Sequence, residues 1–178
     1  MQAPDAAITP NDQPEVSLRP ELPDDVGFLF QVYVSTRTEE LALTNWDEAT
    51  RTAFLTQQFN AMRRGYRDRF PAGEFLIIEV ADQPVGRIVF DISVREIRVV
   101  DVALLPEFRN QGLGTGLMRG VCQEAARTGK VVTLSVLKFN RAGQWYARLG
   151  FTPVGEAGIY DEWEWRPDTG ITGHPKAG

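Results

Sequence analysis

A glycine-rich turn in the middle of the chain reads Arg109-Asn110-Gln111-Gly112-Leu113-Gly114-Thr115-Gly116-Leu117-Met118. It follows an apolar run at 99–105 and leads directly into an amphipathic helical pattern. A strand that enters a helix through such a turn presents unpaired main-chain N–H groups and the positive end of the helix dipole. Glycines let the main chain approach an anion closely, and Arg109 adds a fixed positive charge. The turn therefore predicts a phosphate-binding site.

Spacing excludes two common phosphate-binding motifs. A P-loop ends in Gly-Lys-Ser/Thr, whereas Leu117 and Met118 follow Gly116, so a nucleoside triphosphatase is not expected. A dinucleotide fingerprint needs a third glycine where this chain has Leu117, and the strand expected at 131–136 has no acidic residue for a ribose. The loop before Gly112 is also longer than a dinucleotide fold allows.

The turn resembles the coenzyme A loop of the GNAT superfamily of N-acetyltransferases, in which Gln or Arg is followed by two residues, Gly, one residue and Gly or Ala. The segment 101–108 resembles the fourth strand of that family and the turn after it. A second family element, Asn-x-Ala-x-x-x-Tyr ending in Leu-Gly-Phe, is similar to Asn140-Arg141-Ala142-Gly143-Gln144-Trp145-Tyr146-Ala147-Arg148-Leu149-Gly150-Phe151. The joint occurrence of both motifs, over 101–151, is what makes the resemblance specific.

The resemblance implies acetyl-CoA as the acetyl donor. In the family the fourth and fifth strands splay apart, and the pantetheine arm lies in the gap between them. The main chain of 102–104 would bind this arm, and the main chain of 110–115 would bind the pyrophosphate. Asn140 would cap its helix and contact the arm, and Tyr146 would protonate the sulfur as it leaves. The expected cofactor-binding residues are Val102, Ala103, Leu104, Arg109, Asn110, Gln111, Gly112, Leu113, Gly114, Thr115, Asn140 and Tyr146.

Plainer interpretations of the same residues stay open. Residues 102–104 also suit an ordinary buried strand, and Tyr146 also suits a helical aromatic that packs on the core beside Trp145. Tyr33, Trp46 and Tyr66 are candidates for the acceptor pocket, and they equally suit plain core positions.

The general base is the step that the resemblance does not assign. Some family members carry a glutamate in the fifth strand, five residues before the Asn, where this chain has Ser135, which cannot act as a base at ordinary pH. Asp101 and either Glu39 or Glu40 are the candidates, acting through water. Each of these carboxylates also suits a solvated surface charge.

Composition limits the class of protein. The chain has 178 residues, of which 43% are apolar, enough for one core and too few for two ordinary domains. A net charge of −5 and a pI near 5.0 argue against nucleic-acid binding. Cys122 is the only cysteine and His174 the only histidine, so neither an internal disulfide nor a multi-His metal site is expected. No stretch resembles a leader or a membrane span, which predicts a cytoplasmic protein without membrane contact.

Hydrophobic periodicity predicts the order β-α-α-β-β-β-α-β-α-β-β. The second helix is expected to begin at Thr44, and the helix after the glycine-rich turn to run over 114–128 with Gly129 beyond its end. This order matches the GNAT fold: a mixed α/β (α+β) single domain, with a twisted mixed sheet of about seven strands, helices on both faces and a splayed cofactor cleft. Residues 16–167 form the expected domain, between a disordered arm at 1–15 and a disordered tail at 168–178.

The function that follows is N-acetylation of a primary amine on a small molecule by direct transfer in a ternary complex. Two alternatives remain: a protein or peptide N-acetyltransferase, and a non-catalytic acyl-CoA-binding regulatory module. A homodimer is a further possibility, because the alternation Trp163-Glu164-Trp165 places aromatic side chains either at a dimer surface or on a half-buried strand.

Overall fold

The computed structural model describes residues 16–41 and 44–168, so the predicted N-terminal arm and nearly all of the predicted tail lie outside the described residues. Its elements follow the predicted order, with one additional short helix, α2. They are β1 (Val16–Pro20), η1 (Pro23–Asp25), α1 (Val26–Ser35), α2 (Thr38–Leu41), α3 (Glu48–Arg69), β2 (Glu74–Val80), β3 (Gln83–Ile92), β4 (Glu96–Leu104), η2 (Pro106–Phe108), α4 (Leu113–Thr128), β5 (Val131–Leu137), α5 (Ala142–Arg148), β6 (Thr152–Ala157) and β7 (Tyr160–Trp165).

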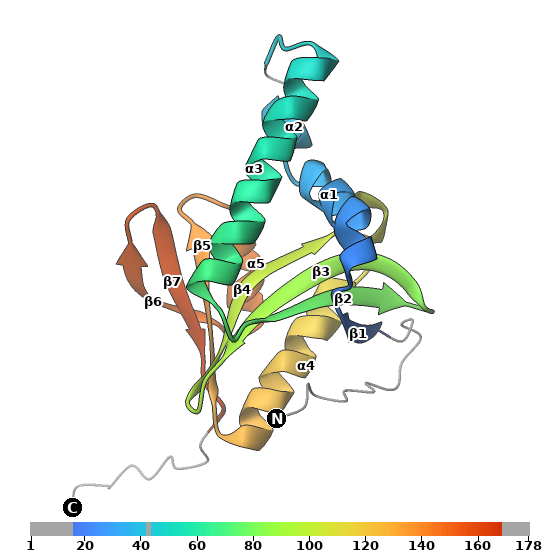
Figure 1. Ribbon diagram of the computed structural model, residues 1–178. Helices are drawn as coiled ribbons and strands as arrows, with labels where there is room; N and C mark the ends of the chain where they lie inside the picture. Colours follow the sequence, from blue (N-terminus) through green and yellow to red (C-terminus); the bar gives the residue numbers. More distant parts are fainter. Residues whose placement is uncertain (1–15, 42–43, 169–178) are drawn as a thin grey trace, which may run out of the picture.

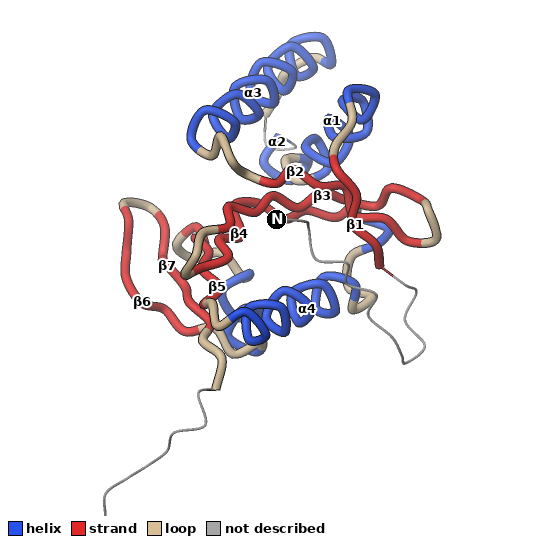
Figure 2. Tube along the Cα trace, turned by 60° about the horizontal axis from the view of Figure 1, so that its bottom comes forward, coloured by secondary structure: helices blue, strands red, loops and turns tan. Residues whose placement is uncertain are grey.

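One mixed sheet organises the described part of the chain. Its seven strands lie in the order β1-β2-β3-β4-β5-β7-β6, and every neighbouring pair is antiparallel except β4 and β5. Helix α4 covers one face of the sheet, and α1 and α3 cover the other, as Figure 1 and Figure 2 show. The predicted fold class, a mixed sheet between two helical layers, is therefore confirmed.

Local sequence signals set the boundaries of the elements. The hairpin between β2 and β3 turns through Ala81 and Asp82, which both adopt positive φ, and Gly129 ends α4 at φ +66°. The predicted start of the second helix at Thr44 is wrong. Helix α3 begins at Glu48, because the Asp47 carboxylate accepts a hydrogen bond from the main-chain N–H of Thr50 at 2.7 Å and so caps the first turn.

The sheet carries a hydrophobic core on each face. Under α4 the core includes Met118 and Ala125, both with no exposed surface, and also Cys122, which is buried as predicted. On the other face α1 and α3 pack Leu29, Phe59 and neighbouring residues against Ile77. Burial of these side chains is the main source of the domain's stability.

The late aromatic strand is half-buried and does not form an aromatic surface. Trp163 and Trp165 of β7 pack against the core under α4, and a Cβ added to Gly143 would lie 3.2 Å from the Trp163 ring. This packing supports the half-buried strand among the two predicted alternatives, and the homodimer stays a prediction.

Candidate active site

The site begins where two neighbouring strands separate. The parallel ladder between β4 and β5 joins only four residue pairs, from Glu96 and Val131 to Val99 and Leu134. Beyond them both strands continue, β4 to Leu104 and β5 to Leu137, without pairing to each other. The predicted splay of the fourth and fifth strands is therefore present.

Strand β4 turns unpaired main-chain groups toward this gap. The N–H of Leu105 donates to the carbonyl of Val85 at 2.9 Å, and antiparallel strands alternate between residues that bond to the partner and residues that face away. Ala103, which lies opposite Arg87, therefore directs its main chain to β3. Val102 and Leu104 direct theirs into the gap, so two of the three residues expected to hold the pantetheine arm are suited to do so by their main chain.

The glycine-rich turn ends in a helix N-terminus with free donors. Gly112 precedes α4 in the left-handed conformation, at φ +83°, and provides no side-chain cap. The first N–H groups of α4, on Leu113, Gly114 and Thr115, have no acceptor within the helix. This arrangement is suited to bind phosphate oxygens, as the sequence predicted, and α4 is long enough, at 16 residues, for its dipole to contribute.

Arg109 contacts the protein rather than lying free beside the turn. Its Nε donates to the carbonyl of Leu104 at 2.8 Å, and its Nη2 donates to Oγ of Ser35 at 2.8 Å. The guanidinium thus ties the end of α1 to the end of β4 and occupies the Leu104 carbonyl. The role of Arg109 as a phosphate ligand stays a prediction.

The second predicted motif packs directly against the first. Nε1 of Trp145, on α5, donates to Oγ1 of Thr115 at 3.1 Å, and a Cβ on Gly114 would lie 3.5 Å from the Trp145 ring. Asn140 caps α5 as expected, because its Oδ1 accepts from the N–H of Ala142 at 2.9 Å. Side chains 30 residues apart in sequence therefore form one continuous wall beside the gap.

Tyr146 packs on the core beside Trp145, and its phenol is also suited to donate a hydrogen bond. Its ring is 7% exposed and packs between Trp145 and Phe151, at centroid distances of 4.6 Å and 5.5 Å. Burial, and to a lesser extent the charge of Asp101, raise the pKa of the Tyr146 phenol to about 12. The hydroxyl forms no hydrogen bond with any of the described residues. A neutral phenol is therefore available as a hydrogen-bond donor.

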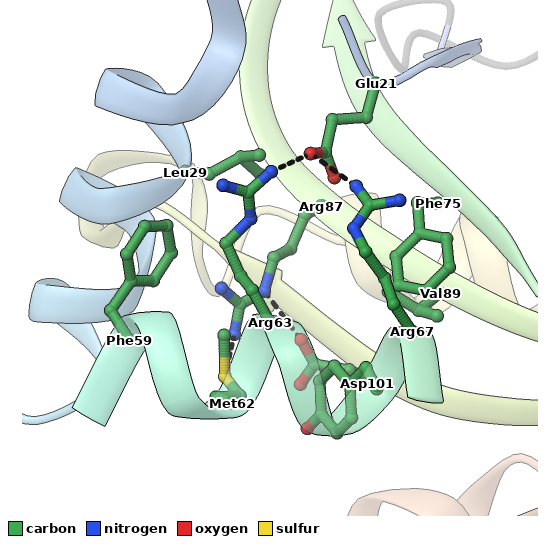
Figure 3. Close-up of a pocket in the computed structure, with 11 residues that line it drawn as sticks. Glu21, Leu29, Phe59, Met62, Arg63, Arg67, Phe75, Arg87, Val89 and Asp101 are labelled. Atoms are coloured by element: carbon green, nitrogen blue, oxygen red, sulfur yellow. Dashed lines mark hydrogen bonds and ion pairs between the residues drawn. The ribbon is translucent and has the colours of Figure 1, made fainter. Parts of the chain in front are cut away.

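Asp101 lies on the opposite face of the sheet, under α3. Its Oδ2 accepts from Nε of Arg87 at 2.6 Å, and Arg87 is buried, with 6% of its surface exposed (Figure 3). Tyr66 lines the same pocket as this ion pair, and burial, followed by the charge of Asp101, raises the pKa of its phenol to about 12. The pocket that these residues line together with residues of α3 is partly open and has room for about 20 Å³, enough for a single water molecule.

The other predicted acceptor residues are placed differently. Tyr33 is buried in the core under α1 and α3, and the Trp46 ring stacks edge-on against Phe54 at 5.1 Å. Tyr66 is thus the one of the three that adjoins Asp101. The side chains of Glu39 and Glu40 lie outside the described residues.

A carboxylate that the sequence analysis did not single out lies at the mouth of the gap. Glu162 of β7 is paired in register with Ser135 of β5, and the Ser135 hydroxyl donates to its Oε1 at 2.7 Å. Nη2 of Arg98 donates to both the Ser135 hydroxyl, at 2.7 Å, and Oε2 of Glu162, at 3.1 Å. The alternation of Tyr160, Glu162 and Glu164 with Asp161 and two tryptophans was the available sequence signal.

The described residues contain no cluster of three or more His, Cys, Asp or Glu side chains able to hold a metal ion. Across those same ranges, none of the helices has both the length and the apolar character that crossing a membrane requires.

Comparison with known families agrees with this geometry. Residues 71–153 match the model of the acetyltransferase (GNAT) domain, a range that includes both motifs and leaves out β1, the helices α1 to α3 and β7. Residues 71–153 of the chain therefore carry a GNAT acetyltransferase domain. None of the curated proteins matches its sequence.

Solved structures share the fold. A PaiA N-acetyltransferase from Thermoplasma acidophilum, in complex with coenzyme A, aligns over 85% of this chain and 99% of its own, at 17% identity and a TM-score of 0.64. An acetyltransferase from Thermus thermophilus aligns over 85% and 97%, at 16% identity and a TM-score of 0.62. Ard1 from Thermoplasma volcanium aligns over 85% and 97%, at 20% identity and a TM-score of 0.57.

Proposed function

We propose that this GNAT protein transfers the acetyl group of acetyl-CoA to a primary amine of a small molecule, directly, within a ternary complex. The observation that carries the proposal is the open β4–β5 gap. It presents the main chain of Val102 and the N–H of Leu104, whose carbonyl is held by Arg109, between the uncapped start of α4 and the wall that holds Tyr146. An extended pantetheine arm matches a strand edge, and a pyrophosphate matches a helix N-terminus.

Tyr146 is suited to assist the departure of the sulfur. With a pKa near 12 its phenol stays protonated at neutral pH, so it can donate a hydrogen bond as negative charge develops on the thiolate. It cannot at the same time be the base that takes a proton from the amine. The two proton transfers therefore need two different groups.

Direct transfer is favoured because the chain lacks an accessible thiol nucleophile. Cys122, the single cysteine, is 7% exposed in the core under α4, and burial raises the pKa of its thiol to about 12. Such a thiol is almost fully protonated at neutral pH and is a poor nucleophile.

A primary amine suits the charges on the acceptor face. The carboxylates of Asp101 and Glu162 lie on this side of the sheet, with the phenol of Tyr66 beside Asp101. Each carboxylate is paired with an arginine, Arg87 or Arg98, and its remaining lone pairs can still accept a hydrogen bond from an ammonium ion.

Two measurements test the proposal. Acetyl-CoA at 100 times its dissociation constant is expected to stabilise the chain by about 2.7 kcal/mol. That corresponds to a rise of about 5 to 11 °C in the midpoint of thermal unfolding. Product formation is then followed with tyramine, spermidine, kanamycin and a peptide with a free N-terminus. Absence of both the thermal shift and any acetylated product would contradict the proposal, and a shift without product would favour the regulatory module.

Tyr146→Phe tests the role of the phenol. The variant keeps the aromatic packing and removes only the donor, so we expect kcat to fall by about 100-fold or more while acetyl-CoA still raises the unfolding midpoint. Tyr33→Phe is the matched control, because Tyr33 is equally buried in the core under α1 and α3. Equal turnover by the two variants would remove Tyr146 from the reaction.

A further inference from the structure

No residue described above takes the proton that the acceptor amine must lose. Only about 0.04% of an alkylammonium with a pKa of ~10.4 is neutral at pH 7, so a base near the gap accelerates transfer considerably. Tyr146 is a protonated donor, and Ser135 lacks basicity. The base must be a carboxylate on the acceptor face.

The register of the sheet places Glu162 on that face. Leu134 and Val136 enter the core under α4, so Ser135 between them points to the opposite face, toward the layer of α1 and α3. Glu162 is paired with Ser135 and hydrogen-bonded to it, one residue beyond the last pair of the β4–β5 ladder, Val99 and Leu134. Its carboxylate therefore lies at the level where the gap opens.

Asp101 is the competing carboxylate, and its partner argues against it. Arg87 is buried, and Asp101 is its only carboxylate partner among the described residues. Protonation of Asp101 would leave a buried guanidinium without a counter-ion, which is strongly unfavourable. Asp101 is thus suited to remain ionised throughout the reaction.

Arg98, the partner of Glu162, tolerates protonation of the Glu162 carboxylate. The side chain of Arg98 is 24% exposed and that of Glu162 is 27% exposed, so water can solvate the guanidinium when the carboxyl becomes neutral. The Ser135 hydroxyl can rotate to accept a hydrogen bond from the protonated carboxyl. The pair therefore permits a proton to arrive and leave.

We propose that Glu162 is the catalytic base of this chain, supplied by β7, and that Arg98 and Ser135 position it. The proposal rests on the acetyl-transfer function proposed above. The carboxylate takes one proton from the acceptor ammonium, directly or through one water molecule. The nitrogen lone pair then forms the bond to the acetyl carbon, and the carbon–sulfur bond breaks with its electron pair on sulfur.

The remaining protons balance the reaction. The departing thiolate takes the proton of the Tyr146 phenol, and the second proton of the nitrogen returns to Tyr146 through water. Glu162 releases its proton to solvent. The sum is one ammonium and one thioester converted to one amide, one thiol and one released proton.

Glu162→Gln tests the assignment, because the amide oxygen can still accept from Arg98 and the amide NH₂ can donate to the Ser135 hydroxyl, but the side chain cannot take a proton. With whichever of the four amines is acetylated, we expect kcat/KM at pH 7 to fall by about 100- to 1,000-fold. The deficit should shrink by about tenfold for each unit of pH, as the amine loses its proton unaided. Arg98 is the charged partner of Glu162, and Tyr160 and Glu164 are its neighbours on the same face of β7; none of them is altered in this variant.

Two further variants serve as controls. Glu164→Gln changes the next carboxylate on the same face of β7, which binds Arg166 at 2.5 Å, and should leave kcat/KM nearly unchanged. Ser135→Glu combined with Glu162→Gln returns a carboxylate to the same place from β5 and should restore most of the loss. Rescue of this kind distinguishes a base from a structural role.

The outcomes separate the two proposals. Turnover of an amine together with an unchanged pH profile in Glu162→Gln overturns the role of Glu162 and leaves acetyl transfer intact. Failure of the unaltered chain to acetylate any of the four amines overturns both. If Glu162→Gln unfolds at a lower temperature and the double variant does not recover activity, Glu162 is structural and the proposal is refuted.

Discussion

Gly86 provides a sharp test of how closely β3 and β4 approach beside the cofactor gap. It lies in β3 opposite Leu104, and a Cβ added there would meet the Ala103 carbonyl oxygen, with Leu104 Cδ2 at 2.7 Å and Leu104 Cα at 3.1 Å. Two of these atoms belong to the main chain of β4. Gly86→Ala therefore cannot be relieved by a side-chain rotation and must displace β4.

Overpacking of this kind costs about 1 to 3 kcal/mol. At this chain length each kcal/mol corresponds to about 2 to 4 °C, so the midpoint of thermal unfolding should fall by about 2 to 12 °C. Because Leu104 borders the gap, the stabilisation by a fixed concentration of acetyl-CoA should also become smaller. Circular dichroism during heating, with and without acetyl-CoA, measures both effects.

Gly65→Ala is the matched control for Gly86→Ala. Gly65 lies within α3 with no atom within 4 Å of the added Cβ, so the same substitution should stabilise the helix by about 0.5 to 1 kcal/mol. Opposite signs for the two variants are expected. A Gly86→Ala variant as stable as the unaltered chain would refute the close approach of the strands and, with it, the position of the gap edge.

Two further predictions follow from buried acidic groups. The Cys122 thiol should react slowly with iodoacetamide in the folded chain and rapidly after unfolding in urea, because burial raises its pKa to about 12; fast labelling of the native chain would contradict its place in the core. The free energy of unfolding should fall as pH rises from about 9 to about 12, since Cys122, Tyr66 and Tyr146 keep protons in the folded chain that the unfolded chain releases from pH 9 to 10 upward. Urea midpoints across this range measure the effect, and Tyr66→Phe should flatten it.

Much of the fold could be predicted from local signals. The helix α4 and the strand β5 show clear periodicity, and their observed bounds differ from the expected ones, 114–128 and 131–136, by one residue each. The start of α3 was misplaced by four residues because two polar residues, Thr44 and Asp47, are both suitable caps. Only tertiary packing decides which of them precedes the first turn.

The donor side of the site was predictable because it is built from contiguous segments. The main chain of the turn after β4 and the residues around Tyr146 each form a local motif, and the two motifs meet through Trp145 and Thr115. The orientation of Arg109 was not predictable, since its partner Ser35 lies 74 residues away in sequence. Long-range contacts of this kind carry no local signature.

The position of Glu162 beside Ser135 depends on the register of the sheet, which is difficult to predict from the sequence. Ser135 and Glu162 are 27 residues apart and meet because β5 and β7 pair antiparallel at that point. A carboxylate that one strand lacks can therefore come from its neighbour, since paired residues of adjacent strands have Cβ atoms only about 5 Å apart. The proposed base must lie at a particular position beside the amine, and a side chain of either β5 or β7 can reach that position.

The bulge in β4 links the two sides of the site. Val89 pairs with Asp101 and Phe90 pairs with Val99, so Val100 is an extra residue in β4. Ile97 and Val99 point into the core under α4, and after the bulge Val102 and Leu104 do so. Strict alternation would instead have placed the Asp101 carboxylate in that core, at a high cost in free energy. The extra residue turns Asp101 toward Arg87 and the acceptor face, and the pairing of β4 with β5 ends next to it. One inserted residue therefore both turns the Asp101 carboxylate to the face that α1 and α3 cover and coincides with the opening between β4 and β5.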